Sequence, residues 1–358
     1  MDRGGNLYGP AYGGGSQNCS NGCGTIFKLT HKGSGWTFTP LYDFQGGADG
    51  EEPFAPLAFG PDGSLYGSSA DASSVFNLRP SPAACKTALC SWAETVTYRF
   101  SEGSGGAFPA GEAIFDQAGN LYGAASGSGG GNCYEGCGTI FKLTPSNGGW
   151  SETVLYTFLG FPTDGATPTS AVFDKAGNIY GTTLAGGTED QGTVFQLTPS
   201  GSGWTEKVLY SFQNAGDGSQ PFGGLILDPS GNLYGTTSDS AWTTAGTVFE
   251  LSPSNGGWTF ATIYSFSGNG GPEASLTMDA AGNLYGTTYR DGAYGYGSVF
   301  KLTPGNGGWT YTSLYDFTGE HDGQNPVSNV VFDAAGNLYG TTYRGGQYYQ
   351  GIVFEITP

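Results

Sequence analysis

Histidine, basic side chains and long apolar runs are all scarce in this chain of 358 residues. The only histidines are His31 and His321, and no serine–histidine–aspartate motif or histidine-rich metal set can be assembled around them. Twelve Lys and Arg against 30 Asp and Glu give a formal charge of −18, which would repel phosphate and argues against a nucleic-acid partner. No apolar run approaches the length of about 18 residues that a membrane-spanning helix needs, so none is expected.

Glycine and aromatic residues are plentiful instead. The chain has 66 Gly and 19 Pro, which interrupt every window longer than about ten residues and leave little room for helix. Aromatic residues make up 15% of the chain, which is enough apolar surface to bury a core. The glycines have no period of three, so a collagen-like chain is excluded. We therefore expect a globular chain built of strands.

The sequence repeats itself along its whole length. The repeating unit has a Leu-Tyr-Gly string, a Val-Phe-x-Leu string, a Trp followed six residues later by Tyr and then by Phe, and a short apolar run that ends in Asp. These β-branched and aromatic runs are typical of strands. The first string begins near Gly5, Gly63, Gly119, Gly177, Gly231, Gly282 and Gly336.

The turns between these strings predict a β-propeller. Asp-x-x-Gly-Asn and Thr-Pro-x-x-Gly-Gly are compact hairpin turns, and a looser connection leads to the next repeat. Four antiparallel strands with tight turns, followed by one looser crossing, are typical of a propeller blade. We therefore expect an all-β fold in which residues 1–358 form a single seven-bladed propeller of four-stranded antiparallel blades. A six-bladed ring or an open array with a surplus hairpin is the alternative.

The strand count is uneven at the two ends of the repeat series. The first blade lacks its innermost strand, and the last blade lacks its outermost strand. Unpaired strand edges recruit other strands. We therefore expect the gaps to be filled by upstream residues of the same gene or by a segment of a neighbouring subunit, which would link subunits into a polymer.

The fourth repeat carries a family resemblance most clearly. Its strings Asn-Ile-Tyr-Gly-Thr-Thr, Gly-Thr-Val-Phe-Gln-Leu-Thr-Pro and Leu-Tyr-Ser-Phe lie between Gly177 and Phe212. They resemble the GloVer tandem repeat of secreted or surface-anchored bacterial proteins, including those of Gloeobacter and Verrucomicrobia, with an NHL-like blade pattern. The resemblance covers nearly the whole chain. It implies export and a repeat architecture, and it carries no catalytic residue onto this sequence.

The six cysteines form three close pairs. Two of the pairs occupy the same place in their repeats, just before Gly-Thr-Ile-Phe. An even count of purely local pairs predicts disulfides and an oxidising, extracellular or cell-surface location, whereas these spacings fit zinc knuckles poorly. The predicted disulfides are Cys19–Cys23, Cys85–Cys90 and Cys133–Cys137.

Carboxylates are spread evenly rather than gathered in one place. The Asp that ends the apolar run recurs in nearly every repeat, for example Asp116 and Asp174, which indicates a structural role. No cofactor is expected. Calcium in the Asp-Gly loops is the alternative, with one carboxylate per loop from Asp49, Asp164, Asp217 and Asp322.

The longer, variable loops share one side of the predicted propeller. Their Tyr, Arg, Gly and Asp residues suit adaptable contacts to a sugar or a protein. The residues predicted for this ligand or partner face are Trp242, Arg290, Tyr294, Tyr296, Arg344, Tyr348 and Tyr349.

Taken by itself, the sequence favours a non-catalytic extracellular structural or adhesion module, not an enzyme. Its expected partners are further copies of itself, another surface protein or a glycan, and fibre formation is compatible with the unpaired strands. A lectin-like, carbohydrate-binding propeller in which Trp242 stacks on a sugar is the alternative hypothesis. An enzyme acting on polysaccharide is the third.

Overall fold

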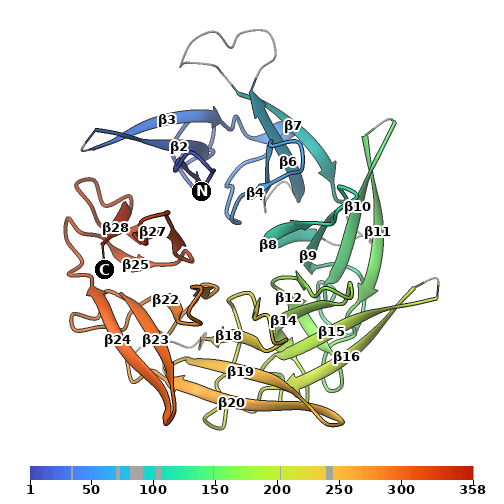
Figure 1. Ribbon diagram of the computed structural model, residues 1–358. Coiled ribbons are helices and arrows are strands. Elements are labelled where there is room, and N and C mark those ends of the chain that lie inside the picture. Colours follow the sequence, from blue (N-terminus) through green and yellow to red (C-terminus); the bar gives the residue numbers. More distant parts are fainter. Residues whose placement is uncertain are drawn as a thin grey trace. The chain divides into compact units, whose positions relative to one another are not determined.

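Antiparallel strands make up nearly all the regular structure of the chain. The computed structural model describes residues 1–33, 35–69, 73–80, 92–101, 107–147, 149–201, 203–238, 245–268 and 270–357. Within these ranges the only helical element is the short 3₁₀ helix Gly47–Asp49, and no helix is long and apolar enough to cross a membrane. Seven sheets form the blades of an all-β, seven-bladed propeller, which confirms the predicted fold class (Figure 1). Two compact units, residues 1–159 and 160–358, contain three and four of the blades.

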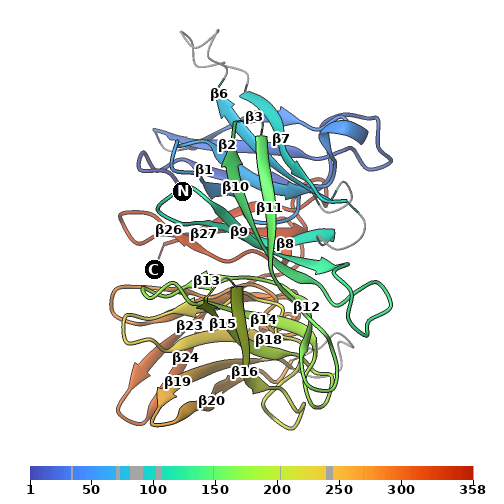
Figure 2. The same ribbon diagram turned by 90° about the vertical axis from the view of Figure 1, so that its right-hand side faces the viewer.

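The unit of residues 1–159 begins with an incomplete blade. Its first sheet has three strands, so the innermost strand is missing at the place the repeat count predicted. The second and third sheets have four strands each, and Figure 2 shows β8–β11 side by side. The strands of the three blades are β1 Leu7–Ala11, β2 Thr25–Lys32 and β3 Gly35–Asp43; β4 Ala58–Phe59, β5 Leu65–Ser69, β6 Ser74–Pro80 and β7 Trp92–Arg99; and β8 Ala107–Phe115, β9 Leu121–Gly127, β10 Thr139–Ser146 and β11 Gly149–Thr157.

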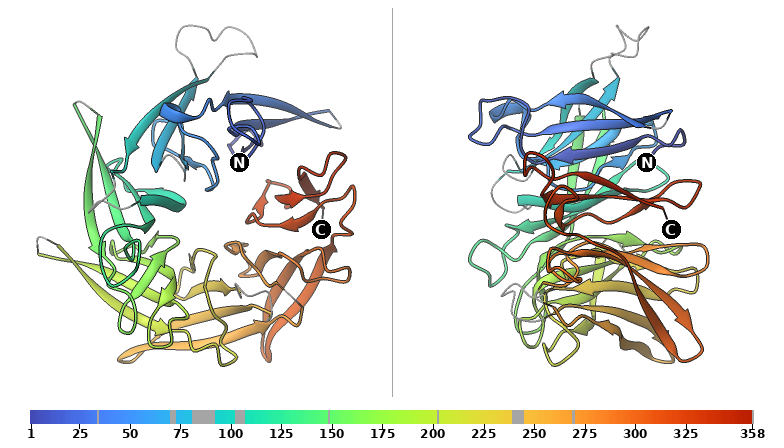
Figure 3. Two further views of the ribbon diagram at one scale, coloured as in Figure 1. Left: turned by 180° about the vertical axis from the view of Figure 1, so that it is seen from behind. Right: turned by 90° about the vertical axis from the view of Figure 1, so that its left-hand side faces the viewer.

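The unit of residues 160–358 contains four blades. In its first and last blades the first strand is split into two short segments that both pair with the second strand. The last blade, red in Figure 3, has no strand beyond β28. The strands are β12 Gly165–Pro168, β13 Val172–Phe173, β14 Ile179–Gly186, β15 Thr193–Ser200 and β16 Gly203–Ser211; β17 Ile226–Leu227, β18 Leu233–Thr237, β19 Thr247–Ser254 and β20 Gly257–Ser265; β21 Thr277–Met278, β22 Leu284–Thr288, β23 Ser298–Gly305 and β24 Gly308–Asp316; and β25 Gln324–Pro326, β26 Val331–Phe332, β27 Leu338–Arg344 and β28 Val353–Ile356.

The recurring Asp closes the turn between the first and second strands of a blade. Asp116 Oδ1 accepts hydrogen bonds from the amides of Ala118 and Asn120, both at 2.9 Å, and Oδ2 accepts from Asn120 Nδ2 and the Tyr122 hydroxyl. Burial alone would raise the pKa of Asp116, but these hydrogen bonds favour the charged form and lower it. The same turn, with the same lowered pKa, is built around Asp2, Asp174, Asp279 and Asp333.

Aromatic rings hold neighbouring blades together. Phe249, on the third strand of its blade, is fully buried, and its ring meets Phe212 of the preceding blade edge-on at 5.2 Å. Gly235, on the adjacent strand β18, lies beneath the Phe249 ring. A large hydrophobic surface is buried at each such contact, which explains why Leu-Tyr-Gly and Val-Phe-x-Leu recur together. Equivalent ring pairs are Phe44–Phe76, Phe100–Phe141, Phe266–Phe300 and Phe317–Phe354.

Candidate functional site

Glu273 departs from the repeat pattern. It follows Pro272 in the connection that enters the sixth blade. A residue that all blades share stabilises the blades. A functional site on a repetitive fold needs residues that occur in one blade only, and Glu273 is such a residue at this position. The residues that follow the corresponding prolines of other blades are uncharged: Phe54, Ala110, Thr169, Phe222 and Val327.

Backbone hydrogen bonds bring the Glu273 segment to the end of strand β22. The carbonyl groups of Gly270 and Gly271 accept the amides of Arg290 and Tyr289 at 3.0 and 3.1 Å. Gly271 also lies so close to Gly246 that a Cβ would be 2.5 Å from the Gly246 nitrogen, so a side chain there would force the segment outward. The local backbone thus places Glu273 beside the Tyr289–Arg290 pair.

The seventh blade supplies a second Tyr–Arg pair, Tyr343 and Arg344, at the end of β27. Asn325, on β25, connects the two pairs. Its Nδ2 donates to the Tyr289 carbonyl at 2.8 Å, and its neighbour Gln324 pairs with Arg344 across the sheet. Asn325 is buried and adopts a positive φ of 55°, a conformation that is sparsely populated outside glycine.

The electrostatics of this group are distinctive. Burial raises the pKa of Glu273 to about 7, against the opposing positive charge of Arg290. The pKa of the Tyr289 hydroxyl is also raised, first by burial and then by the charge of Glu273, while Arg290 and Arg344 act in the opposite direction. Each guanidinium carbon lies 5.4 Å from the ring centroid of its neighbouring tyrosine. We call Glu273, Tyr289, Arg290, Tyr343 and Arg344 the Glu273 cluster.

This arrangement can carry out acid–base chemistry on an anion. A carboxyl group with a pKa near 7 can both accept and donate a proton at neutral pH. Guanidinium groups bind carboxylates and phosphates and stabilise developing negative charge. Arg290 and Arg344 are the only arginines between residue 100 and the C-terminus, so their proximity in an acidic chain is a specific feature.

Exposed tyrosines border the Glu273 cluster. Tyr294 and Tyr296 follow the first Tyr–Arg pair, and Tyr348 and Tyr349 follow the second, all of them exposed. Because tyrosine combines a flat apolar face with a polar tip, such side chains suit the faces of sugar rings. The structure therefore brings together Arg290 and Arg344 from the predicted ligand face and places these tyrosines next to them in sequence. Trp242 lies outside the described residues.

Glu94 and Glu206 also have raised pKa values, but they belong to the scaffold. Burial, followed by the charge of Asp49, raises the pKa of Glu94 to about 7, and burial with Asp164 does the same for Glu206. Both occupy the strand position two residues after the repeated Trp. In the fifth blade Phe260 fills that position and stacks on Tyr210 of the preceding blade, so the position serves contact between blades.

The predicted calcium ligands are engaged in turns. Asp217 accepts from the Tyr210 hydroxyl at 2.8 Å and from two backbone amides, and Asp322 accepts from the Tyr315 hydroxyl and from Thr318. Asp49 accepts from Tyr42, and Asp164, which is buried, accepts from the Gly165 amide. Each carboxylate thus has a structural use.

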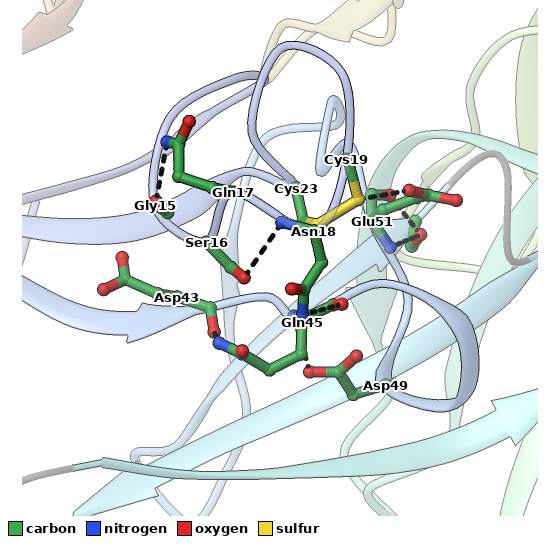
Figure 4. Close-up of a disulfide and its surroundings, with 11 residues drawn as sticks. Gly15, Ser16, Gln17, Asn18, Cys19, Cys23, Asp43, Gln45, Asp49 and Glu51 are labelled. Atoms are coloured by element: carbon green, nitrogen blue, oxygen red, sulfur yellow. Dashed lines mark hydrogen bonds between the residues drawn. A yellow bond between two sulfur atoms is a disulfide. The ribbon is translucent and has the colours of Figure 1, made fainter.

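Two of the predicted disulfides are present. Cys19–Cys23 and Cys133–Cys137 each close a short loop with Cα atoms 5.1 Å apart. Figure 4 shows the first with Glu51, whose Oε2 lies 2.7 Å from Cys19 Sγ. The pair Cys85 and Cys90 lies outside the described residues.

Several solved structures with a similar fold carry the names of enzymes. A protein assigned as a 6-phosphogluconolactonase from Bacteroides uniformis has a TM-score of 0.59 at 16% identity, with 98% of this chain and 95% of that chain covered. A catalytically inactive virginiamycin B lyase from Staphylococcus aureus has a TM-score of 0.58 at 14% identity, with 98% and 96% covered. A protein assigned as a glucose dehydrogenase from Thermus thermophilus has a TM-score of 0.53 at 17% identity, with 85% and 96% covered. At these identities the likeness establishes the fold.

The comparisons correct the function expected from the sequence. The expectation of a non-catalytic structural or adhesion module, and of a chain that is not an enzyme, is wrong, because the similar propellers are a virginiamycin B lyase and two proteins assigned as a lactonase and a dehydrogenase. The physical error lies in the weight given to histidine. A half-buried glutamate with arginine and tyrosine neighbours can carry out acid–base chemistry, so the scarcity of histidine excludes only histidine-based sites.

Sequence comparison places the chain in a repeat family. No match was found among the curated proteins. The model of the Gloeobacter/Verrucomicrobia repeat matches residues 69–273 and, in an overlapping second match, residues 174–358. These matches cover well over half of the chain and include the Glu273 cluster. The chain belongs to the Gloeobacter/Verrucomicrobia repeat family.

Proposed function

We propose that this protein is an enzyme that hydrolyses a cyclic ester of an anionic sugar derivative, with Glu273 as the general base. The observation that carries the proposal is the Glu273 cluster: one carboxyl group with a pKa raised to about 7, with Tyr289 and the exposed Arg290 beside it and the exposed Tyr343–Arg344 pair beside Tyr289. The similarity of the fold to a protein assigned as a 6-phosphogluconolactonase supports this substrate class.

The proposed reaction assigns each side chain one task. The Glu273 carboxylate takes a proton from a water molecule as the water oxygen attacks the ester carbonyl carbon. Arg290, whose positive charge acts on Glu273, stabilises the negative charge that develops on the carbonyl oxygen. The ester C–O bond then breaks, and the alkoxide leaving group receives the proton from Glu273. Arg344 binds the anionic substituent of the substrate, and Tyr343 offers its ring to the sugar.

The test compares the rates at which the protein hydrolyses a phosphorylated aldonolactone and the unphosphorylated lactone. The carboxylic acid released by hydrolysis is measured. We expect turnover of the phosphorylated compound, a fall in kcat of about 100-fold or more in Glu273→Gln, and a raised KM in Arg344→Ala. Glu189→Gln, at an exposed loop position, is the matched control and should match the wild type. Equal rates in Glu273→Gln and wild type would refute the assignment of the base.

We also propose an extracytoplasmic location. Its support is the pair of short-range disulfides, which persist in oxidising compartments. Detection of the native protein in the periplasmic or culture fraction, and its absence from the cytosolic fraction, is the test.

A further inference from the structure

A carboxylate lies against a sulfur atom that cannot donate to it. Cys19 Sγ is 2.7 Å from Glu51 Oε2, although the residues are 32 positions apart (Figure 4). A disulfide sulfur carries no hydrogen, so in the oxidised form the contact cannot be an S–H···O hydrogen bond. In the reduced form the Cys19 thiol can donate to Glu51, or both groups can bind one cation. Reduction would thus turn this contact into one that can hold a proton or a cation.

Three potential metal ligands converge at this point. The Sγ atoms of Cys19 and Cys23 and a carboxylate oxygen of Glu51 all lie within 4.8 Å of one another. Among the described residues this is the only group of three or more His, Cys, Asp or Glu with that property. Two thiolates and a carboxylate are ligands that zinc accepts in tetrahedral sites.

A glycine keeps the convergence point free of side-chain atoms. Gly46 has φ +80°, and a Cβ built on it would lie 3.1 Å from Cys19 Sγ, 3.4 Å from Cys23 Sγ and 3.7 Å from Glu51 Oε2. The same spot is thus close to all three ligand atoms. Hydrogen bonds from Asn18 Nδ2 to the Gln45 carbonyl, and from the Gln45 amide to Asp49 Oδ2, anchor the chain that carries Gly46.

The backbone holds Glu51 in place independently of the disulfide. The Glu51 amide donates to Ser69 Oγ at 3.1 Å, and the Ser69 hydroxyl donates to the Glu51 carbonyl. The next amide, that of Glu52, donates to the Cys23 carbonyl at 2.9 Å. Ser69 and Cys23 are fully buried. These bonds do not involve the sulfur atoms, so reduction leaves the Glu51 backbone anchored beside the Cys19–Cys23 loop.

We propose that Cys19, Cys23 and Glu51 form a redox-gated binding site for a thiophilic divalent cation such as Zn²⁺ or Cd²⁺. An external dithiol transfers two electrons and two protons to the disulfide, giving two thiols and a cyclic disulfide of the reductant. The cation then displaces two protons and binds two thiolates and the carboxylate. Water occupies the fourth position, which makes this an open, three-ligand site. The inference is independent of the proposed lactone hydrolysis.

The third repeat offers a matched control within the same chain. Cys133–Cys137 has the same separation and the same Cα distance as Cys19–Cys23. In the sequence repeat, however, Asp49-Gly50-Glu51 corresponds to Asp164-Gly165-Ala166, so the carboxylate has no counterpart. The second pair should thus be reducible without forming a three-ligand site.

The test uses the full chain with Cys85→Ser and Cys90→Ser, after reduction. It is titrated with Cd²⁺, and binding is measured by the ultraviolet thiolate-to-cadmium charge-transfer band. We expect one tightly bound Cd²⁺ ion per chain. This binding should persist in the double variant Cys133→Ser, Cys137→Ser and should be lost in the double variant Cys19→Ser, Cys23→Ser. Glu51→Gln should weaken binding at least tenfold while the thiol count stays unchanged. The oxidised protein should show no such band.

Two outcomes would overturn the proposal. One is an affinity in Glu51→Gln equal to that of the unsubstituted background. The other is equal binding by the Cys133–Cys137 pair alone, which would show that any reduced short loop binds the cation. Circular dichroism of each reduced variant establishes that it is folded, and native mass spectrometry gives the stoichiometry without relying on the charge-transfer band.

Discussion

The ring of Phe249 lies over Gly235 so closely that a Cβ at Gly235 would be 2.4 Å from Phe249 Cζ and 2.9 Å from Leu225 Cδ2. Gly235→Ala must therefore displace a fully buried ring, and we expect a loss of about 1–3 kcal/mol in the free energy of unfolding. Urea denaturation measures it. Gly257→Ala is the control, since nothing lies within 4 Å of its Cβ. A loss below about 0.5 kcal/mol in Gly235→Ala would show that the ring moves freely.

Glu206 predicts a pH dependence of stability. Burial, followed by the charge of Asp164, raises its pKa in the folded chain to about 7 from the ordinary value of 4.5. The contribution of protonated Glu206 to the free energy of unfolding is fully present below about pH 4.5, and it is lost as the pH rises through about 7. Relative to Glu206→Gln, the wild type should lose about 1–2 kcal/mol between these values, after allowance for solvent screening. Thermal unfolding of both proteins across this range, with Glu189→Gln as control, measures the difference.

Arg290 should set the pH profile of the proposed reaction. Its positive charge opposes the effect of burial on Glu273, so Arg290→Ala should raise the pKa of Glu273 further above about 7. The acid limb of kcat/KM for lactone hydrolysis should then move to higher pH. Lys301→Ala, which removes a positive charge near Tyr285, is the control and should leave the limb in place. A shift to lower pH would contradict the role of Arg290.

The Cys133–Cys137 disulfide should stabilise the chain modestly. For the short loop that it closes, the chain-entropy estimate is about 2 kcal/mol. We expect Cys133→Ser, Cys137→Ser to lose about this amount in denaturant unfolding and to keep lactone hydrolysis, because both residues lie outside the Glu273 cluster. Loss of hydrolysis in a folded variant would show a coupling that the described contacts do not contain.

The sequence was sufficient for the blades because their signals are local and repeated. Val194 and Phe195, for example, lie on β15 and pair with Thr182 and Gly181 of β14, as the two repeated strings predicted. The short segments β12 and β25 could not be predicted in this way. Each has only three or four residues in a connection without alternating hydrophobicity, and each depends on pairing with a strand later in the chain.

The candidate site was only partly predictable. Arg290 and Arg344 were expected on a ligand face, but Glu273 carries no motif. The signal that finds it is an alignment of the repeats, in which a single carboxylate replaces Phe222 or Val327. Glu51 could not be placed beside Cys19 from the sequence, because their contact depends on how two loops fold against each other.

The Asp turns and the half-buried glutamates Glu94 and Glu206 respond to acid in opposite ways. The lowered pKa of carboxylates such as Asp116 keeps the turns intact until the pH falls below their ordinary value of 3.8. The raised pKa of Glu94 and Glu206 favours the folded chain below about 7. Conformational stability should therefore be greatest in mildly acidic surroundings. At mildly acidic pH the net charge of −18 also becomes smaller, because carboxylates are protonated. The pH that best preserves the fold is therefore one at which electrostatic repulsion between molecules is weaker.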